Sequence, residues 1–276
     1  MTALDAAPLP AAPPALPWWR RWLRLLSHLV WWDMVSLYFG SWAGVLWNFV
    51  LPVVVILAYL AIFELTPGFR FGGGRDVVGG FGVNLVAGLI PWMLFQEGVS
   101  RAASAFVDNR HVLSQIALPA PLFPLANVGS ALVRHVVALA IFAGILVATG
   151  HAPTKHWVVV PVMTAVLLVM TAGCALIVAC LTVLWRDVAP TVGVAMLPLF
   201  FATPIIYPTY VVPGPLRVLM DLNPLSGLVV GYRDLLVTGR WPMDGPTWYS
   251  LGVGLVALAL GIVLVRRVGP ELAERL

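Results

Sequence analysis

The chain has 276 residues, of which 61% are hydrophobic and only 10% are charged, with a formal net charge of +4. A soluble domain averages about 25% charged residues, so this composition excludes an ordinary water-soluble protein and indicates a polytopic membrane protein. The basic residues lie in short clusters between apolar segments, a pattern typical of membrane topology signals and not of a nucleic-acid-binding surface.

Two segments precede the first apolar span. Residues 1–17 are rich in Ala and Pro and lack the basic cluster followed by an apolar segment that is typical of a signal peptide. We therefore expect a disordered cytoplasmic tail. Residues 18–33 predict an amphipathic helix that is too charged to cross the bilayer and lies in its inner interface, as an anchor or as a guide for a lipid-linked substrate. Its apolar face holds Trp18, Trp22, Leu25, Leu26 and Leu29, and its polar face holds Arg20, Arg21, Arg24 and His28.

Six apolar segments are long enough to cross about 30 Å of hydrocarbon as helices. The predicted spans are 42–63, 82–107, 122–149, 157–184, 188–208 and 248–267, which places both termini in the cytoplasm and leaves 268–276 as a cytoplasmic tail. The excess of basic residues favours this orientation. Nine lie inside (Arg20, Arg21, Arg24, Arg101, Arg110, Arg186, Arg266, Arg267 and Arg275) and six outside (Arg70, Arg75, Lys155, Arg217, Arg233 and Arg240).

The second and third spans are joined by a cytoplasmic segment over 108–118 that is polar at its start and apolar at its end. It predicts a short helix along the membrane surface that could dock in the groove of a partner and transmit its motion. The residues that would make this contact are Asp108, Asn109, Arg110, His111, Val112 and Leu113.

The fifth span and the region after it are interrupted by prolines. Proline removes a backbone donor, and the freed carbonyls must face protein or a wet cavity, so this part of the chain is expected to line a pathway. Residues 209–239 predict two short re-entrant helices on the outer side, the second with Asn223 as its cap and Pro224 in its first turn.

Apart from Arg266 and Arg267 at the end of the last predicted span, the charged residues inside the predicted spans are Glu97, Arg101 and Arg134. Such charges are expensive in a bilayer and are either paired or functional, which leaves open a structural Glu97–Arg134 or Glu97–Arg101 pair. A proton relay would need several acidic groups in line, so coupling to an ion gradient is disfavoured. We find no phosphate-binding loop, metal-ligand spacing or catalytic set, and Cys174 and Cys180 predict packing only.

Several short motifs are more specific together than alone. They are the run Asp33–Trp47 with Pro52, the run Gly88–Trp92 with Phe95, Asn109 with Leu118, Pro119 and Pro124, and then Arg186-Asp187, Thr203-Pro204-Ile205, Tyr207, Asn223-Pro224 and Tyr232-Arg233. In this order and spacing they resemble the ABC-2 type permeases that export O-antigen, capsule or teichoic acid. The resemblance covers about residues 30–267 and makes 34–267 an ABC-2 type transmembrane domain.

The resemblance implies a homodimer of six-span subunits in the bacterial inner membrane, with two separate ATP-binding subunits that carry ATP and Mg. The chain itself would hold no cofactor and would not be an enzyme. Residues 108–118 would be the coupling helix, 209–239 the outer gate helices, and a lipid-linked polysaccharide the substrate.

The resemblance also suggests an aromatic-lined channel, and aromatic rings offer flat platforms for sugar faces without holding hydroxyl groups tightly. For each aromatic side chain, packing against lipid is an equal alternative. Arg233 would contact the glycan or pair with Asp234 or Asp221. The candidates for the path are Trp47, Trp92, Phe95, Phe200, Phe201, Tyr207, Tyr210 and Arg233.

Two other functions stay open. One is an ABC-2 exporter of a small hydrophobic drug or lipid. The other is a membrane-embedded glycan or lipid transferase, which would need acidic residues in its pocket.

Overall fold

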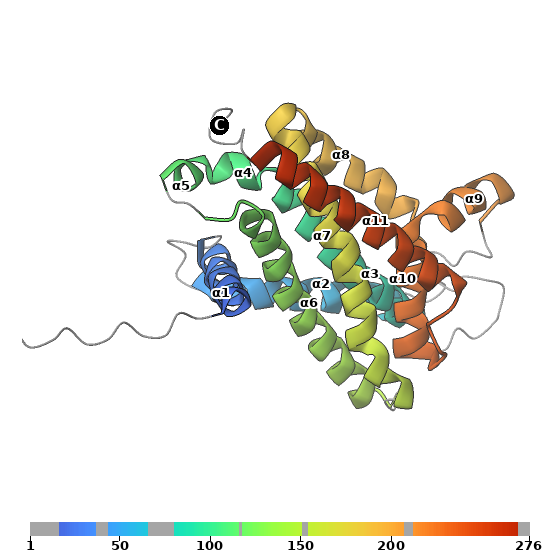
Figure 1. The fold of residues 1–276 in the computed structure, drawn as a ribbon. Coiled ribbons are helices and arrows are strands. Elements are labelled where there is room, and N and C mark those ends of the chain that lie inside the picture. Colours follow the sequence, from blue (N-terminus) through green and yellow to red (C-terminus); the bar gives the residue numbers. More distant parts are fainter. Residues whose placement is uncertain are drawn as a thin grey trace, which may run out of the picture.

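The computed structural model describes residues 17–36, 44–65, 80–115, 118–150, 154–206 and 212–269, and within these segments it holds helices and turns but no strand (Figure 1). Two 3-10 turns, η1 and η2, cover Gly44–Leu46 and Lys155–Val159, and a π-helical turn, η4, covers Asp234–Thr238. The α-helices are α1 Trp18–Ser36, α2 Trp47–Leu65, α3 Gly80–Ala103, α4 Ala105–Asp108, α5 Arg110–Gln115, α6 Leu122–Ala148, α7 Val160–Leu184, α8 Val188–Phe201, α9 Gly214–Leu222, α10 Pro224–Arg233 and α11 Gly245–Val268.

Three of the described helical segments are long and apolar enough to cross a membrane, namely α6, η2 continued by α7, and α11. Shorter apolar helical stretches cover Pro52–Ile62 and Val188–Phe201. The all-helical membrane class predicted from the sequence is thereby confirmed. The 14 residues of α8 extend over about 21 Å, less than the hydrocarbon thickness of about 30 Å.

Helix ends differ from the predicted spans where the backbone cannot continue. The predicted span 188–208 is helical only to Phe201, because a proline disfavours helical geometry at the residue before it and Pro204 follows closely. The predicted span 82–107 is divided at Ser104, where α3 ends and α4 begins. The two short helices expected within 209–239 are present as α9 and α10.

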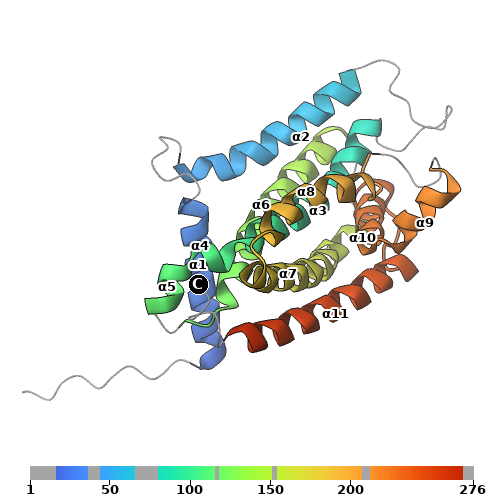
Figure 2. The ribbon, with the colours of Figure 1, turned by 90° about the horizontal axis from the view of Figure 1, so that it is seen from above.

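Helix α3 forms the centre of the bundle. It contacts α6, α7, α10 and α2, and an unbroken run of its residues from Gly82 to Trp92 is buried. Figure 2 shows α2 along one edge and α11 along the opposite edge, where α11 packs on α7. The core therefore lies between α3 and its neighbours, and α2 and α11 form the two flanks.

Small residues allow α7 and α11 to pack closely. A side chain at Gly173 would collide with the backbone of Ala257 and Leu258, and Gly261 lies against Leu176 of α7. Close backbone approach at small residues is a common way for helices to associate where the solvent is apolar and the hydrophobic effect is weak. This contact accounts for Gly173 on α7 and for Gly254 and Gly261 on α11, which lies against Met170 and Leu176 of α7 at these two positions.

The two ends of the bundle differ in composition. One end, here the α5 end, holds α1, α4, α5 and the C-terminal end of α11, whereas the opposite end, the α9 end, holds α9, α10 and the start of α11 (Figures 1 and 2). Helix α1 crosses the α5 end at a steep angle to α2 and α11 (Figure 2). It packs on α6, where Gly129 leaves room for Val30.

Candidate functional site

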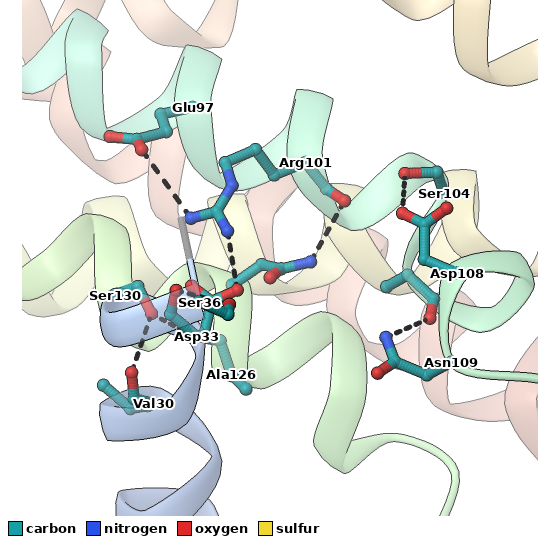
Figure 3. A network of polar contacts seen from close by, with 12 residues as sticks. Val30, Asp33, Ser36, Glu97, Arg101, Ser104, Asp108, Asn109, Ala126 and Ser130 are labelled. Carbon is teal, nitrogen blue, oxygen red and sulfur yellow. Dashed lines mark hydrogen bonds and ion pairs between the residues drawn. The ribbon is translucent and has the colours of Figure 1, made fainter. Parts of the chain in front are cut away.

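A chain of ion pairs, formed by Asp33, Arg101, Glu97 and Arg134, joins three helices near the α5 end. Arg134 Nε of α6 donates to Glu97 Oε2 at 2.8 Å, and its Nη2 lies 2.5 Å from Glu97 Oε1. Arg101 Nη1 lies 3.8 Å from Glu97 Oε1, and Arg101 Nη2 donates to Asp33 Oδ1 of α1 at 2.6 Å (Figure 3). The structure thus brings together all three charged residues singled out in the predicted spans and adds Asp33.

Burial makes this chain of ion pairs a strong constraint on helix positions. The side chain of Arg134 is 9% exposed and that of Glu97 is 31% exposed. A bidentate arginine–carboxylate pair fixes orientation as well as distance, and an uncompensated charge at such a site is costly. Since α1, α3 and α6 share these four side chains, a shift of α3 relative to its neighbours has to be accompanied by α1 or break an ion pair.

Directly after the chain of ion pairs, α3 ends in a polar joint that leads into the predicted coupling segment. Ser104 Oγ donates to Asp108 Oδ2 at 2.6 Å, and Asn109 Nδ2 donates to the Ala105 carbonyl at 2.8 Å (Figure 3). Such side-chain bonds compete with the regular helix ladder. The segment predicted as one helix over 108–118 is therefore divided, with Asp108 at the end of α4 and α5 running over Arg110–Gln115.

Helix α5 is exposed at the end of the bundle. Arg110, His111 and Val112 are exposed, whereas Leu113 is partly buried. Leu113 packs against a small apolar cluster in which Phe106, 1% exposed, meets α7 and α11. Four of the six predicted contact residues thus lie on this accessible helix, Asp108 and Asn109 directly precede it, and Leu113 packs it against the cluster that contains Phe106. The sequence analysis missed Phe106, although its apolar spacing of seven residues from Leu113 was a signal.

A cavity of about 360 Å³ opens beside this joint, between α1, α4 and α6. Asn127 of α6 closes one side and donates to the Arg101 carbonyl at 3.0 Å. Trp32 and Asp33 contribute from α1, and Asp108 contributes from α4. The joint therefore borders open space between α1, α4 and α6.

Helix α1 is amphipathic over most of its length, with Leu25, Leu26 and Leu29 of the predicted apolar face partly buried. Arg20, Arg21 and Arg24 are exposed, and Trp22 is partly buried. Trp18 is also exposed, and a second band of exposed tryptophans, which includes Trp31 and Trp32, lies near the other end of the helix. Tryptophan and arginine together are the side chains that favour a membrane–water boundary.

Four of the predicted path residues form one aromatic cluster where α3 meets α8. The ring of Trp92 lies 6.2 Å from that of Phe95 and 5.5 Å from that of Phe200, measured between centroids, and Phe200 lies 5.5 Å from Phe201. Trp92 and Phe95 are buried, whereas Phe201 is exposed. Trp47 lies apart from this cluster, at the start of α2, and is partly buried. Tyr207 and Tyr210 lie outside the described residues.

Arg233, the remaining path candidate, ties three elements together. Its Nε donates to the Asn84 carbonyl of α3 at 3.1 Å, and its Nη2 donates to the carbonyls of Pro204 at 3.0 Å and Ile205 at 2.9 Å. These last two carbonyls lie in the turn where α8 has ended. The guanidinium passes over Gly88, where a Cβ would lie 3.0 Å from Nη2. Arg233 thus donates hydrogen bonds to two carbonyl groups of the proline-rich turn that have no partner within a helix.

A second polar group, in the middle of the bundle, escaped the sequence analysis. The hydroxyl of Tyr232 on α10 lies 3.2 Å from His135 Nε2 and 2.7 Å from Thr164 Oγ1, and all three residues are buried. His135 Nδ1 faces the Ile90 carbonyl at 3.3 Å. The only signal was the presence of single polar residues in apolar segments, which does not say which of them meet.

These features are those of a membrane-embedded helical subunit: a bundle of apolar helices with an internal polar joint and a short exposed helix at one end. The chain belongs to the ABC-2 type transporter family, whose model matches residues 24–237. It is therefore a membrane permease whose ATPase partner is a separate subunit, and the resemblance seen in the sequence is confirmed.

The chain is similar to permeases of known export systems. It is 30% identical to the O-antigen export system permease protein RfbA of Myxococcus xanthus, over 85% of this chain and 88% of that protein. It is 25% and 24% identical to two O-antigen export system permease proteins RfbA of Klebsiella pneumoniae, over 83% and 75% of this chain and 87% and 78% of those proteins.

Proposed function

We propose that this chain is the membrane subunit of a bacterial ABC exporter that moves a lipid-linked polysaccharide of the O-antigen type outward across the inner membrane. The observation that carries the proposal is the similarity to O-antigen export permeases along almost the whole chain. The fold supports it with an exposed helix for a driving partner and an aromatic cluster suited to sugar faces.

The proposed topology has six crossings, by α2, α3, α6, α7, α8 with the turn that follows it, and α11, and it places the α5 end in the cytoplasm. Basic residues support this orientation, because cytoplasmic ends of spans are enriched in Arg and Lys. Apart from Arg134, which lies within α6, eight of the described Arg and Lys residues belong to elements at the α5 end (Arg20, Arg21, Arg24, Arg101, Arg110, Arg186, Arg266 and Arg267) and four to elements at the α9 end (Lys155, Arg217, Arg233 and Arg240).

In the proposed mechanism a partner ATPase closes on ATP and pushes α5. The push reaches the bundle by two routes: through Phe106 to α7 and α11, and through the joint at Ser104 to Arg101. Because Arg101 pairs with Asp33, the second route moves α1 with α3. The interface helix then shifts as the coupling helix does, which opens a lateral path between α2 and α8 for the lipid-linked head.

The proposed assembly is a homodimer of this chain with two ATP-binding subunits. Apolar side chains on the outer faces of α2 and α8 support it, since Val54 and Leu57 of the first and Val194 and Leu197 of the second are exposed. Such faces need lipid or a second subunit to cover them. ATP and Mg would bind to the partner, and this chain would carry helix motion and the glycan path.

The test changes the coupling surface in the assembled transporter. The double variant Asn109→Asp plus Arg110→Glu is expected to keep ATP hydrolysis and lose display of the polymer on the cell surface. Arg240→Glu, an exposed charge at the α9 end, is the matched control and should leave both unchanged. Unchanged display in the double variant would remove α5 from the mechanism, and normal display in cells that lack this chain would refute the proposed function.

A further inference from the structure

A second cavity, the outer pocket, lies at the α9 end between the end of α9, the first turns of α10 and the start of α11. Its volume is about 330 Å³, within the range of small-molecule sites. It is distant from α5 and belongs to none of the clusters described above. Its polar and aromatic lining residues are Asp221, Asn223, Ser226, Asp244 and Tyr249.

The floor of the outer pocket carries a polar atom without a protein partner. Ser226 is 7% exposed, and its Oγ makes no hydrogen bond with any described part of the chain. Next to it, Gly227 lies against the carbonyl of Pro246, where a Cβ would be only 2.5 Å from the oxygen, so the missing side chain lets α10 and the start of α11 meet at this edge of the pocket. A buried hydroxyl left in this way costs free energy that a ligand with a matching group recovers.

The walls of the outer pocket supply hydrogen-bond acceptors. Asp244 caps α11, with Oδ1 accepting from Thr247 N at 3.2 Å and from Thr247 Oγ1 at 3.1 Å, and only this one oxygen is engaged by the two bonds. Asp221 lies 3.9 Å from Arg217, and both side chains are more than half exposed, so the pair is weak. Both carboxylates therefore keep acceptor sites for a ligand in the pocket.

An aromatic side chain stands at the rim. The hydroxyl of Tyr249 donates to the Leu222 carbonyl at 3.0 Å, which holds the side chain between α11 and the end of α9. The residue is 45% exposed, so part of its ring remains available for contact. Carboxylates, a hydroxyl and an aromatic ring are the combination that matches the hydroxyl groups and the C–H face of a sugar.

We propose that the outer pocket binds one neutral sugar residue of the exported glycan as it leaves the bundle. The assignment rests on the proposed function, because a sugar reaches this pocket only if the α9 end faces outward and glycan is the cargo. Two carboxylates disfavour an anionic ligand. A metal ion is disfavoured too, since no set of three His, Cys, Asp or Glu residues in the described segments could hold one. Sugar hydroxyl groups donate to the carboxylates and exchange hydrogen bonds with Ser226.

Such a pocket holds the emerging chain weakly without stopping it. Part of its wall is the solvent-exposed Asp221, and the ring of Tyr249 closes only one side. A bound sugar residue opposes backward sliding of the polymer while the bundle resets. This role differs from that of the aromatic cluster at α3 and α8, which lies inside the bundle.

Saturation-transfer difference NMR on the full chain in lipid nanodiscs tests the inference, with methyl glycosides of glucose, galactose, mannose, rhamnose and N-acetylglucosamine as probes. At least one is expected to bind at millimolar concentration, with a signal reduced at least fivefold by Ser226→Ala and by Asp244→Asn. Both changes preserve the fold, because the Ser226 hydroxyl has no protein partner and asparagine caps a helix as well as aspartate. Ser27→Ala, at the opposite end of the chain, should leave the signal unchanged.

Two outcomes overturn the inference. One is that no glycoside gives a signal that depends on Ser226. The other is that ethanolamine binds with this dependence and the glycosides do not, which would make the outer pocket a site for an ammonium headgroup. Neither outcome affects the proposed function, whose own test is loss of surface polymer in cells lacking this chain.

Discussion

Replacing Glu97 by glutamine should lower the free energy of unfolding of the bundle, and the burial of the Glu97–Arg134 pair determines how much. The substitution keeps shape and removes the charge that Arg134 meets bidentately, at 2.8 and 2.5 Å. Breaking a fully buried pair costs about 3–5 kcal/mol and breaking an exposed pair costs less than about 1 kcal/mol. Since Arg134 is 9% and Glu97 31% exposed, we expect a loss of about 2 kcal/mol, roughly thirtyfold in the ratio of folded to unfolded protein.

The assay is equilibrium unfolding of the purified chain in mixed micelles. The control is Asp221→Asn, because Arg217 and Asp221 lie 3.9 Å apart with side chains 57% and 64% exposed, and its loss should stay below about 0.5 kcal/mol. The double variant Glu97→Gln plus Arg134→Met removes both charges and should be less destabilised than Glu97→Gln alone. The reasoning fails if Glu97→Gln costs no more than the control, or if the double variant is the least stable of the set.

Three further predictions concern packing, buried hydrogen bonding and coupling. Gly173→Ala should lower stability by about 1–3 kcal/mol, because its Cβ would strike the backbone of α11, whereas Gly252→Ala on the open face of α11 should not; equal effects would contradict the close α7–α11 contact. Tyr232→Phe should cost about 1–3 kcal/mol, because the buried His135 Nε2 loses its hydroxyl partner and Thr164, which still donates to the Val160 carbonyl, loses one hydrogen bond. This cost should exceed that of Tyr249→Phe at the rim of the outer pocket, and the opposite order in the same unfolding assay would contradict the reasoning. Phe106→Ala should reduce surface polymer while the partner ATPase still hydrolyses ATP, and a parallel fall of both would show that the change only unfolds the subunit.

Composition and periodicity were sufficient for the class and most of the helices. Long apolar segments have few alternatives to helix in a bilayer, since every backbone group needs an internal partner. The predicted spans 122–149 and 157–184 accordingly match α6 and η2 with α7 closely. Helix ends that depend on prolines and polar side chains were harder to predict from the sequence, as the early end of α8 and the break at Ser104 illustrate. At such positions, competition between side-chain and backbone hydrogen bonds determines where the helix ends, and hydropathy carries no information about this competition.

Some features of the candidate site could also be predicted from the sequence, and others could not. Exposure of α5 could be expected from its polar start and its place between two spans, and the pairing of Glu97 with Arg134 was one of two alternatives left open. The link from Arg101 to Asp33 could not be found, since the two residues are 68 positions apart and meet only because α1 folds back across α6. No spacing rule connects such pairs.

The sequence by itself determined the solvent in which this protein folds, the family to which it belongs and the helices that it forms, because these follow from hydrophobicity and from local motifs. Only the tertiary structure decided which polar groups meet inside the bundle, as with Tyr232, His135 and Thr164, and where the outer pocket opens. The physical reason is that burying an isolated polar group is costly wherever it lies, so its presence predicts that a partner exists, while the identity of the partner depends on how helices cross.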